Sequence, residues 1–220
     1  MKKTILLVIL LTGAFGLPKA KACTGITLQT IDSQIITART IEWAAEPLNM
    51  MYVVVPRGLK QRSWLPDGTL HGKKFNAEYG YVGIAVENDE FIMEGINEVG
   101  LAAGLFYFPD YGEYMPYKDE DKSMCVSDMQ FVAWVLSTCS TIDEMIALIP
   151  TIRVIGIDPR ASTVHWRVTE PSGRQVVIEI VNQQVMVHEN PLGVLTNSPE
   201  FTWHLTNLNN YVHLASGSTH

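Results

Sequence analysis

The chemistry that Cys23 can perform depends on whether the chain is cut directly before it. Ala20-Lys21-Ala22 precedes it and has the small-residue pattern at which signal peptidases cut. A cut after Ala22 would leave Cys23 with a thiol and a free α-amine on one residue. A thiolate is a strong nucleophile, and an amine with a pKa of about 7.7–8.0 is suited to general-base catalysis near neutral pH. The stretch therefore predicts a nucleophile and its base on the same residue.

Four other residues have side chains that would serve such a centre. Arg39 would supply a permanent cation beside the thiolate, and Glu42 would orient the amine by accepting its hydrogen bonds. Asn97, at a predicted turn, and Asn197, at a predicted strand end, are donors of the kind that stabilises an oxyanion. Simpler explanations stay open, because an Arg–Glu pair on a hairpin is commonly a surface ion pair and asparagine is common in turns.

Residues 1–22 have the three parts of a secretory signal peptide. Lys2 and Lys3 form its basic start, residues 5–17 form its apolar run, and the cleavage site follows. We therefore expect a periplasmic or secreted protein whose mature part is one domain over residues 23–220.

Lipidation of Cys23 is an alternative of another class. The protein would then be a lipidated periplasmic binding or structural protein rather than an enzyme. Lys21 fits a lipidation site poorly, as does the absence of a leucine-like residue three positions before Cys23.

Composition excludes several other functions. The net charge is −7 and no cluster of Lys or Arg occurs, which argues against nucleic acid as a partner. The three cysteines do not have metal-site or redox spacing, so we expect neither a metal nor a cofactor, and we expect Cys125 and Cys139 to be buried apolar residues. His165 and His204 have no acidic partner at a suggestive spacing, so a Cys–His dyad is possible but has no support.

A β-hairpin is predicted directly after Cys23, with strands at residues 24–30 and 35–41 and a turn at 31–34. If Asp32-Ser33 forms a two-residue loop, Cys23 pairs with Glu42 and Arg39 lies on the opposite face, because side chains alternate. A longer loop would exchange the two. Both residues serve one site only if a bulge or a strand end lies between them.

The rest of the chain alternates between strand and helix signals. Residues 57–74 and 109–122 are predicted as loops, with further turns at 88–89 and 97–100. Strands are predicted at residues 51–56, 81–86, 91–95, 101–108, 162–169, 175–181, 184–188 and 193–196. Helices are predicted from a Ser127 cap to Cys139, from a Thr141-x-x-Glu144 capping box to Leu148, and from Ser198-Pro199 onward. This order predicts an α+β fold with helices packed on antiparallel sheets.

Four segments together resemble the choloylglycine hydrolase family, which holds conjugated bile salt hydrolases and penicillin V acylases. They are Cys23-Thr24-Gly25, Ala38-Arg39-Thr40-Ile41-Glu42-Trp43, Gly95-Ile96-Asn97-Glu98-x-Gly100-Leu101 and Thr196-Asn197-Ser198-Pro199-x-Phe201-x-Trp203-His204. The resemblance spans residues 23 to about 211 and keeps the order of the motifs.

The resemblance implies the αββα sandwich of the N-terminal nucleophile hydrolases, and commonly a homotetramer. Cys23 would be nucleophile and base, Arg39 would support it, and Asn97 and Asn197 would bind the oxyanion. Glu42 stands where the family usually has Asp. Family chains also continue past residue 220 with further strands, a helix and a second arginine, so we expect the fold to be incomplete there.

The expected substrate is a small-molecule amide. The resemblance favours a conjugated bile salt, from which glycine or taurine would be released through a thioester acyl-enzyme. Penicillin V or an N-acyl-homoserine lactone would be cleaved at the same site, and motifs shared by the whole family do not separate these substrates.

Overall fold

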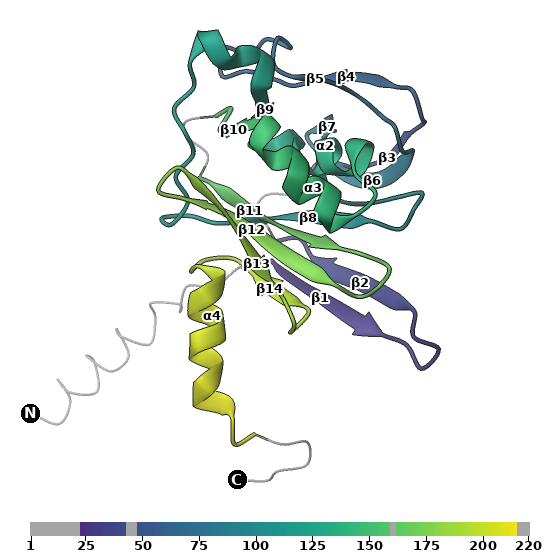
Figure 1. Cartoon of the computed structure of the whole chain (residues 1–220), viewed down its shortest axis with the longest axis vertical. Coiled ribbons are helices and arrows are strands. Elements are labelled where there is room, and N and C mark those ends of the chain that lie inside the picture. Colours follow the sequence, from purple (N-terminus) through teal and green to yellow (C-terminus); the bar gives the residue numbers. More distant parts are fainter. Residues whose placement is uncertain (1–22, 43–47, 159–161, 215–220) are drawn as a thin grey trace, which may run out of the picture.

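Two antiparallel sheets packed face to face form the body of the protein. The structure is a computed structural model that describes residues 23–42, 48–158 and 162–214, so the predicted signal peptide lies outside the described residues. Figure 1 shows helices α2 and α3 on one side of the larger sheet and strands β1, β2 and β14 on its other side. Among the described residues the layers are therefore helix, sheet and sheet, with α4 extending from the end of the body.

The larger sheet has seven strands in the order β13-β12-β11-β8-β7-β6-β3, and neighbours pair antiparallel. Their bounds are β3 (Met50–Val55), β6 (Tyr81–Val86), β7 (Asn88–Asn97), β8 (Ala102–Tyr107), β11 (Val164–Thr169), β12 (Gln175–Val181) and β13 (Gln184–Glu189). Every residue of β11, and all but the last of β12, is buried. These strands are covered on both faces, so even their polar residues, such as His165, Arg167 and Glu179, are buried.

The smaller sheet has the order β14-β1-β2, with β1 (Thr24–Gln29) in the middle, β2 (Ile35–Thr40) on one side and β14 (Val194–Thr196) on the other. Both pairings are antiparallel. The strand that begins at the predicted nucleophile is thus held on both edges.

Helices α2 (Phe131–Thr138) and α3 (Ile142–Leu148) cover the outer face of the larger sheet. Residues 131–137 of α2 are all buried, and residues 131–136 join the main apolar cluster together with residues of β6, β7 and β8. The predicted cap of α3 is confirmed, since Thr141 Oγ1 accepts from the Glu144 N–H at 3.1 Å. The Glu144 carboxylate reaches back to the Ser140 N–H at 2.7 Å.

The remaining elements are short. Strands β4 (Lys60–Arg62) and β5 (Lys74–Asn76) pair antiparallel, and β9 (Cys125–Ser127) and β10 (Arg153–Ile155) pair parallel. The 3-10 helices are η1 (Asp119–Met124), η2 (Asp128–Gln130), η3 (Ile149–Thr151) and η4 (Leu208–Tyr211), and α4 spans Phe201–Asn207. No helix among the described residues is long and apolar enough to cross a membrane.

The bounds of three predicted elements were wrong. The segment 57–74, predicted as a loop, contains β4. This strand was missed because its three residues are too few to show alternation. The predicted turn at 88–89 centres instead on Glu87, whose φ is 63°, and β7 begins at Asn88. The last helix begins at Phe201 with Glu200 at its N-cap, and Ser198 instead donates its hydroxyl to the Pro109 carbonyl at 2.7 Å.

The loop between β1 and β2 has three residues rather than two. The Thr30 N–H donates to the Gln34 carbonyl at 2.9 Å, which leaves residues 31–33 in the loop. Ser33 has a φ of 65°, the left-handed conformation that commonly ends a three-residue hairpin loop.

This loop decides which side chains share a face with Cys23. Arg39 pairs with Gly25, two residues from Cys23, and side chains two apart on a strand point the same way. Arg39 therefore lies on the face of Cys23, about 7–8 Å along the diagonal of the pair. The two-residue loop was wrong, and the longer loop left open as its alternative is confirmed.

The hairpin gives a direct test of this register. Deleting Ile36 from β2 makes Arg39 pair with Ile26 and turns its side chain to the opposite face, so we expect a loss of about 3–5 kcal/mol in the free energy of unfolding, or no folded protein. Ser33→Gly keeps the loop length and should stay within about 1 kcal/mol of the unmodified chain. Urea denaturation measures both, and equal stability of the deletion would contradict the register.

Candidate active site

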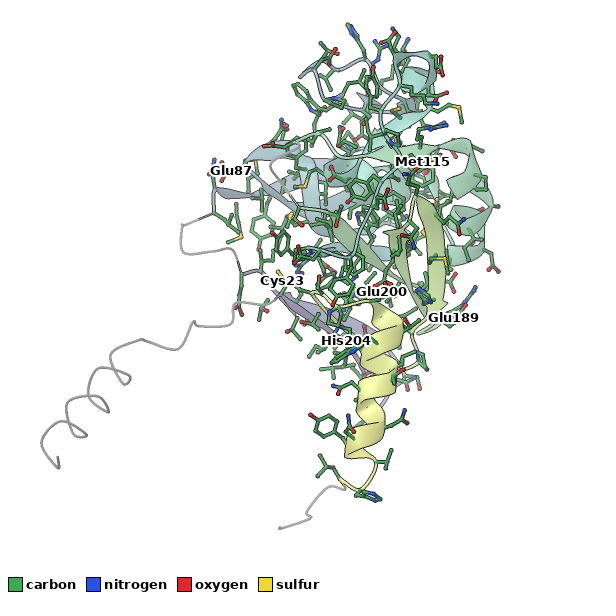
Figure 2. All side chains as sticks on the ribbon, turned by 90° about the vertical axis from the view of Figure 1, so that its left-hand side faces the viewer. Cys23, Glu87, Met115, Glu189, Glu200 and His204 are labelled. Atoms are coloured by element: carbon green, nitrogen blue, oxygen red, sulfur yellow. The ribbon has the colours of Figure 1, made fainter. Side chains whose placement is uncertain are left out.

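Cys23 lies at the start of β1, where both neighbouring strands hold it. Its carbonyl accepts from Thr196 Oγ1 at 2.8 Å, and its Sγ donates to the Glu42 carbonyl at 3.7 Å. The thiol is unpaired, and the residue is 4% exposed. Figure 2 shows Cys23 at the edge of the body, and it packs with Phe201 at the start of α4.

Cys23 lines a cavity of about 480 Å³. Most of its wall is apolar and comes from Ile41, Leu48, Val86, Phe91, Met93, Leu105, Met129, Ile157 and Val164. Such a wall suits a large apolar group held beside the thiol.

Carboxyl groups also reach this cavity. Glu42, Glu87, Asp128 and Asp158 line it. Asp128 is 5% exposed, and its burial raises its pKa to about 7, against hydrogen bonds from backbone N–H groups that favour the charged form. The wall is thus less negative near neutral pH than its composition suggests.

Arg39 is held by backbone carbonyls of the larger sheet. Its Nη1 donates to the Met93 carbonyl at 3.0 Å and to the Leu105 carbonyl at 2.5 Å, and both of these residues line the cavity. The guanidinium also lies over the Phe106 ring, 4.2 Å from the ring centroid. The structure therefore brings Arg39 to the cavity wall that carries Cys23.

Glu42 reaches the site from the end of the hairpin. It is exposed, it lines the cavity, and its carbonyl accepts from the thiol of Cys23. Glu42 lies beyond the last paired residue of β2, Thr40. The end of β2 thus lies between Arg39 and Glu42 and lets both approach Cys23. This is one of the two conditions under which the sequence allowed both residues to serve one site.

Asn197 follows β14 and faces the start of β1. Thr196 pairs with Thr24, so the next positions, Asn197 and Cys23, lie opposite each other. The Tyr107 N–H donates to Asn197 Oδ1 at 3.2 Å, which leaves the amide NH₂ as the donor of this side chain. Tyr107 itself lines the cavity.

The structure does not bring Asn97 to this site. Asn97 ends β7 at the position paired with Tyr81, whereas the cavity is lined by Phe91 and Met93 from the other part of the strand. Its Nδ2 donates to the Leu136 carbonyl at 3.2 Å and to the Cys139 carbonyl at 2.8 Å. Its Oδ1 accepts from the Leu101 N–H at 2.9 Å, so the side chain joins the end of α2 to the β7–β8 turn.

His165 has the acidic partner that its sequence spacing did not reveal. It lies directly across from Glu179 on β12, and Nδ1 is 3.0 Å from Glu179 Oε1 while Nε2 is 2.9 Å from the Thr196 carbonyl. The Glu179 carboxylate also accepts from the Phe201 N–H at 2.9 Å. This buried pair fixes β14 and the start of α4, and thereby the segment that holds Asn197.

The other two cysteines are buried, as predicted. Cys125 and Cys139 are both 0% exposed and unpaired. Burial raises the pKa of the Cys139 thiol to about 11 and also raises that of Cys125. Neither is therefore suited to attack near neutral pH.

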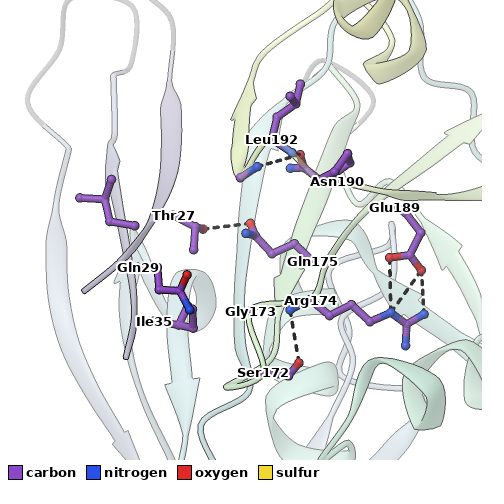
Figure 3. Close-up of a pocket in the computed structure, with 13 residues that line it drawn as sticks. Thr27, Gln29, Ile35, Ser172, Gly173, Arg174, Gln175, Glu189, Asn190 and Leu192 are labelled. Atoms are coloured by element: carbon purple, nitrogen blue, oxygen red, sulfur yellow. Dashed lines mark hydrogen bonds and ion pairs between the residues drawn. The ribbon is translucent and has the colours of Figure 1, made fainter. Parts of the chain in front are cut away.

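A second cavity, of about 410 Å³, lies near the far end of β1 (Figure 3). Its polar groups largely satisfy one another: Thr27 donates to Gln175 Oε1 at 2.9 Å, and Arg174 Nη2 lies 2.7 Å from Glu189 Oε1. The residues that line it include none of those predicted for the site. It lies between strands of the two sheets, and no cysteine is among the residues that line it.

Known proteins resemble this chain in both sequence and fold. The profile of the family described as "Linear amide C-N hydrolases, choloylglycine hydrolase family" matches residues 23–220. The chain belongs to the choloylglycine hydrolase family. It is 29% identical over 198 residues to a bile salt hydrolase/transferase of Clostridium perfringens, covering 87% of this chain and 58% of that protein. It is 30% identical over 193 residues to a penicillin V acylase of Pectobacterium atrosepticum, covering 80% of this chain and 48% of that protein.

Solved structures of choloylglycine hydrolases confirm the predicted α+β fold of the N-terminal nucleophile hydrolases. An arginine-to-leucine variant of conjugated bile acid hydrolase from C. perfringens matches with a TM-score of 0.75 at 29% identity, covering 90% of this chain and 60% of that one. Penicillin V acylase from Agrobacterium tumefaciens has the same fold, with a TM-score of 0.74 at 22% identity, covering 88% and 58%. The chain thus spans between about half and 60% of the length of these relatives.

Asn97 provides a test of the site boundary. Asn97→Ala leaves two carbonyls and one N–H buried without a partner, so we expect the free energy of unfolding to fall by about 2–4 kcal/mol. Alkylation of Cys23 by iodoacetamide should keep its rate in the folded protein. Asn76→Ala, at an exposed position, is the matched control. Unchanged stability combined with altered Cys23 reactivity would place Asn97 at the site.

Proposed function

We propose that this protein is an exported amide hydrolase that removes glycine or taurine from conjugated bile salts, with Cys23 as its nucleophile. One observation carries the proposal: an unpaired thiol lines a mostly apolar cavity and has Arg39 on its own face of the hairpin. Membership in a family of linear amide C–N hydrolases supports the reaction type.

Cleavage of the Ala22–Cys23 bond is the activating step in this proposal. The freed α-amine takes the thiol proton, and the thiolate attacks the amide carbon. The C–N bond then breaks, and the amine returns the proton to the leaving nitrogen, which departs as glycine or taurine. Water next attacks the thioester, and the free acid leaves as the thiol is restored.

The surrounding residues have separate tasks. Arg39 stabilises the thiolate electrostatically. The Asn197 amide, oriented by the Tyr107 N–H, donates to the oxyanion. Glu42, exposed beside the thiol, accepts hydrogen bonds from the new amine. Asn97 has no part in this chemistry, because its amide is used in the core.

A bile acid is the favoured acyl group. The cavity wall beside Cys23 is broad and apolar, as a sterol-like acyl group requires, and the C. perfringens relatives are named for bile salts. One solved C. perfringens structure has an arginine replaced and another has a cysteine replaced. The separation of those two positions in sequence equals that of Cys23 and Arg39, which supports equivalent places in the site. We further propose a periplasmic or secreted homotetramer.

Penicillin V is the second candidate substrate. It is supported by the 30% identity to the Pectobacterium enzyme, which is higher than the identity to the Clostridium one. Its phenoxyacetyl group is much smaller than a bile acid, so relative rates on the two substrates distinguish the candidates.

The decisive experiment compares glycocholate, taurocholate and penicillin V on the exported protein, with its N-terminus determined by mass spectrometry. We expect a free Cys23 amine and faster hydrolysis of the bile salts. Cys23→Ser should lower the rate by about 10³-fold or more, because the nucleophile is lost.

Cys125→Ala is the matched control, since it removes another buried, unpaired thiol. It should keep most of the activity. Retained hydrolysis in Cys23→Ser would refute the nucleophile, and a diacylglyceryl adduct on Cys23 would show a lipidated protein instead.

A further inference from the structure

Three buried charges meet between the two sheets, behind the cavity wall. Glu94 on β7 has Oε2 3.5 Å from Arg39 Nη1 and Oε1 3.0 Å from Arg167 Nη2. The side chains of Arg39 and Arg167 are 4% and 1% exposed, and that of Glu94 is 16% exposed. The cluster links β2 of the smaller sheet with β7 and β11 of the larger sheet.

Two glycines make room for this cluster. Gly104 on β8 pairs with both Glu94 and Arg167, and a Cβ at this position would collide with Glu94 Oε2. Gly25 on β1 pairs with Arg39, and a Cβ there would lie 2.7 Å from Arg167 Nη1. One glycine from each sheet thus opens the space that the three charged side chains fill.

Stability alone does not explain these charges. Moving an ion out of water costs several kcal/mol, and apolar residues of similar volume commonly stabilise a fold as well or better. Burial raises the pKa of Glu94, against the opposing effect of Arg167 and Arg39, and burial lowers the pKa of Arg167. With all three groups ionised the cluster has a net charge of +1, which lies beside the site rather than on the surface.

The cluster acts on Cys23 through Arg39. Arg39 shares the face of Cys23 and donates to two carbonyls of the cavity wall. Arg167 Nη1 donates to the Ile26 carbonyl of β1 at 3.2 Å, so it also holds the strand that begins after Cys23. Phe106, which lies beneath both guanidinium groups, packs with Cys23 in one apolar cluster.

Arg39 and Glu94 each keep one polar atom that makes no hydrogen bond. Among the described residues, Arg39 Nη2 and Glu94 Oε2 are buried and make no hydrogen bond. The carboxylate therefore orients Arg39 mainly by charge, and one donor of the guanidinium remains available.

We propose that Glu94 and Arg167 are positioning residues that fix Arg39 and set the net charge beside the thiol of Cys23. The catalytic consequence rests on the proposed function, whereas the effect on the thiol does not. The other charged groups near the thiol are the α-amine of Cys23 itself, once cleavage has freed it, and Glu42, Glu87, Asp128 and Asp158 of the cavity wall; all of them stay constant in the variants below.

The charge balance predicts shifts of opposite sign. Glu94→Gln raises the net charge of the cluster to +2, which favours the thiolate and lowers the pKa of Cys23. Arg167→Met lowers the net charge to zero, which raises that pKa. Each shift should be on the order of one pH unit, as expected for one unit of charge near a titrating group in a partly buried site.

The test is the pH dependence of alkylation by iodoacetamide on the exported protein with a free Cys23 terminus. Mass spectrometry of the Cys23 peptide excludes signal from the buried Cys125 and Cys139. We expect the midpoint to move to lower pH in Glu94→Gln and to higher pH in Arg167→Met. Arg167→Lys keeps the charge and should leave the midpoint near that of the unmodified protein.

Shifts in the same direction, or none in folded variants, would overturn the proposal. If Arg167→Met does not fold, Arg167→Gln replaces it. If neither Arg167→Met nor Arg167→Gln folds while Arg167→Lys does, the Glu94–Arg167 pair is purely structural, and this would also overturn the proposal. Because alkylation needs no substrate, absence of amide hydrolysis refutes the proposed function without affecting this result.

Discussion

The guanidinium of Arg39 fastens the smaller sheet to the larger one. It leaves β2, crosses the space between the sheets and donates to carbonyls of β7 and β8. The stacking on Phe106 holds it from the other side. Cys23 lies two residues from the partner of Arg39 on β1, so the position of the thiol against the cavity depends on this contact.

Several features of the fold make this contact of Arg39 with the larger sheet possible. A three-residue hairpin loop turns Arg39 inward rather than outward. Gly25 and Gly104 leave the space in which the charges meet. At the other side of Cys23, the His165–Glu179 pair fixes β14, so the segment with Asn197 approaches the same point. The site is thus assembled from three strands of the smaller sheet supported by buried polar groups of the larger one.

Much of the fold could be predicted from the sequence, because it depends on local signals. Alternation and turn residues located the long strands, and the Thr141 cap fixed the start of α3. The face of Arg39 could not be decided, since it depends on whether the loop has two or three residues. Short strands such as β4 and β5, of three residues each, left no pattern to predict them by.

The site was predicted less completely, for a different reason. Cys23, Arg39, Glu42 and Asn197 converge, but Asn97 is a common turn residue whose position near the end of α2 is set by tertiary packing. Glu94, Arg167 and Glu179, the partner of His165, were not found from the sequence. Each is a single charged residue within a strand, and its partner is determined by which strands are neighbours.

The central claim is that the thiol of Cys23 forms a covalent bond to the acyl group of the substrate. The most direct measurement is the mass of the exported protein after acid quenching during turnover of glycocholate, followed by peptide mapping. The account predicts an added cholyl group on the Cys23 peptide that is lost with hydroxylamine, as expected of a thioester. Hydrolysis without this adduct in a single-turnover time course, or an adduct on another residue, would contradict it.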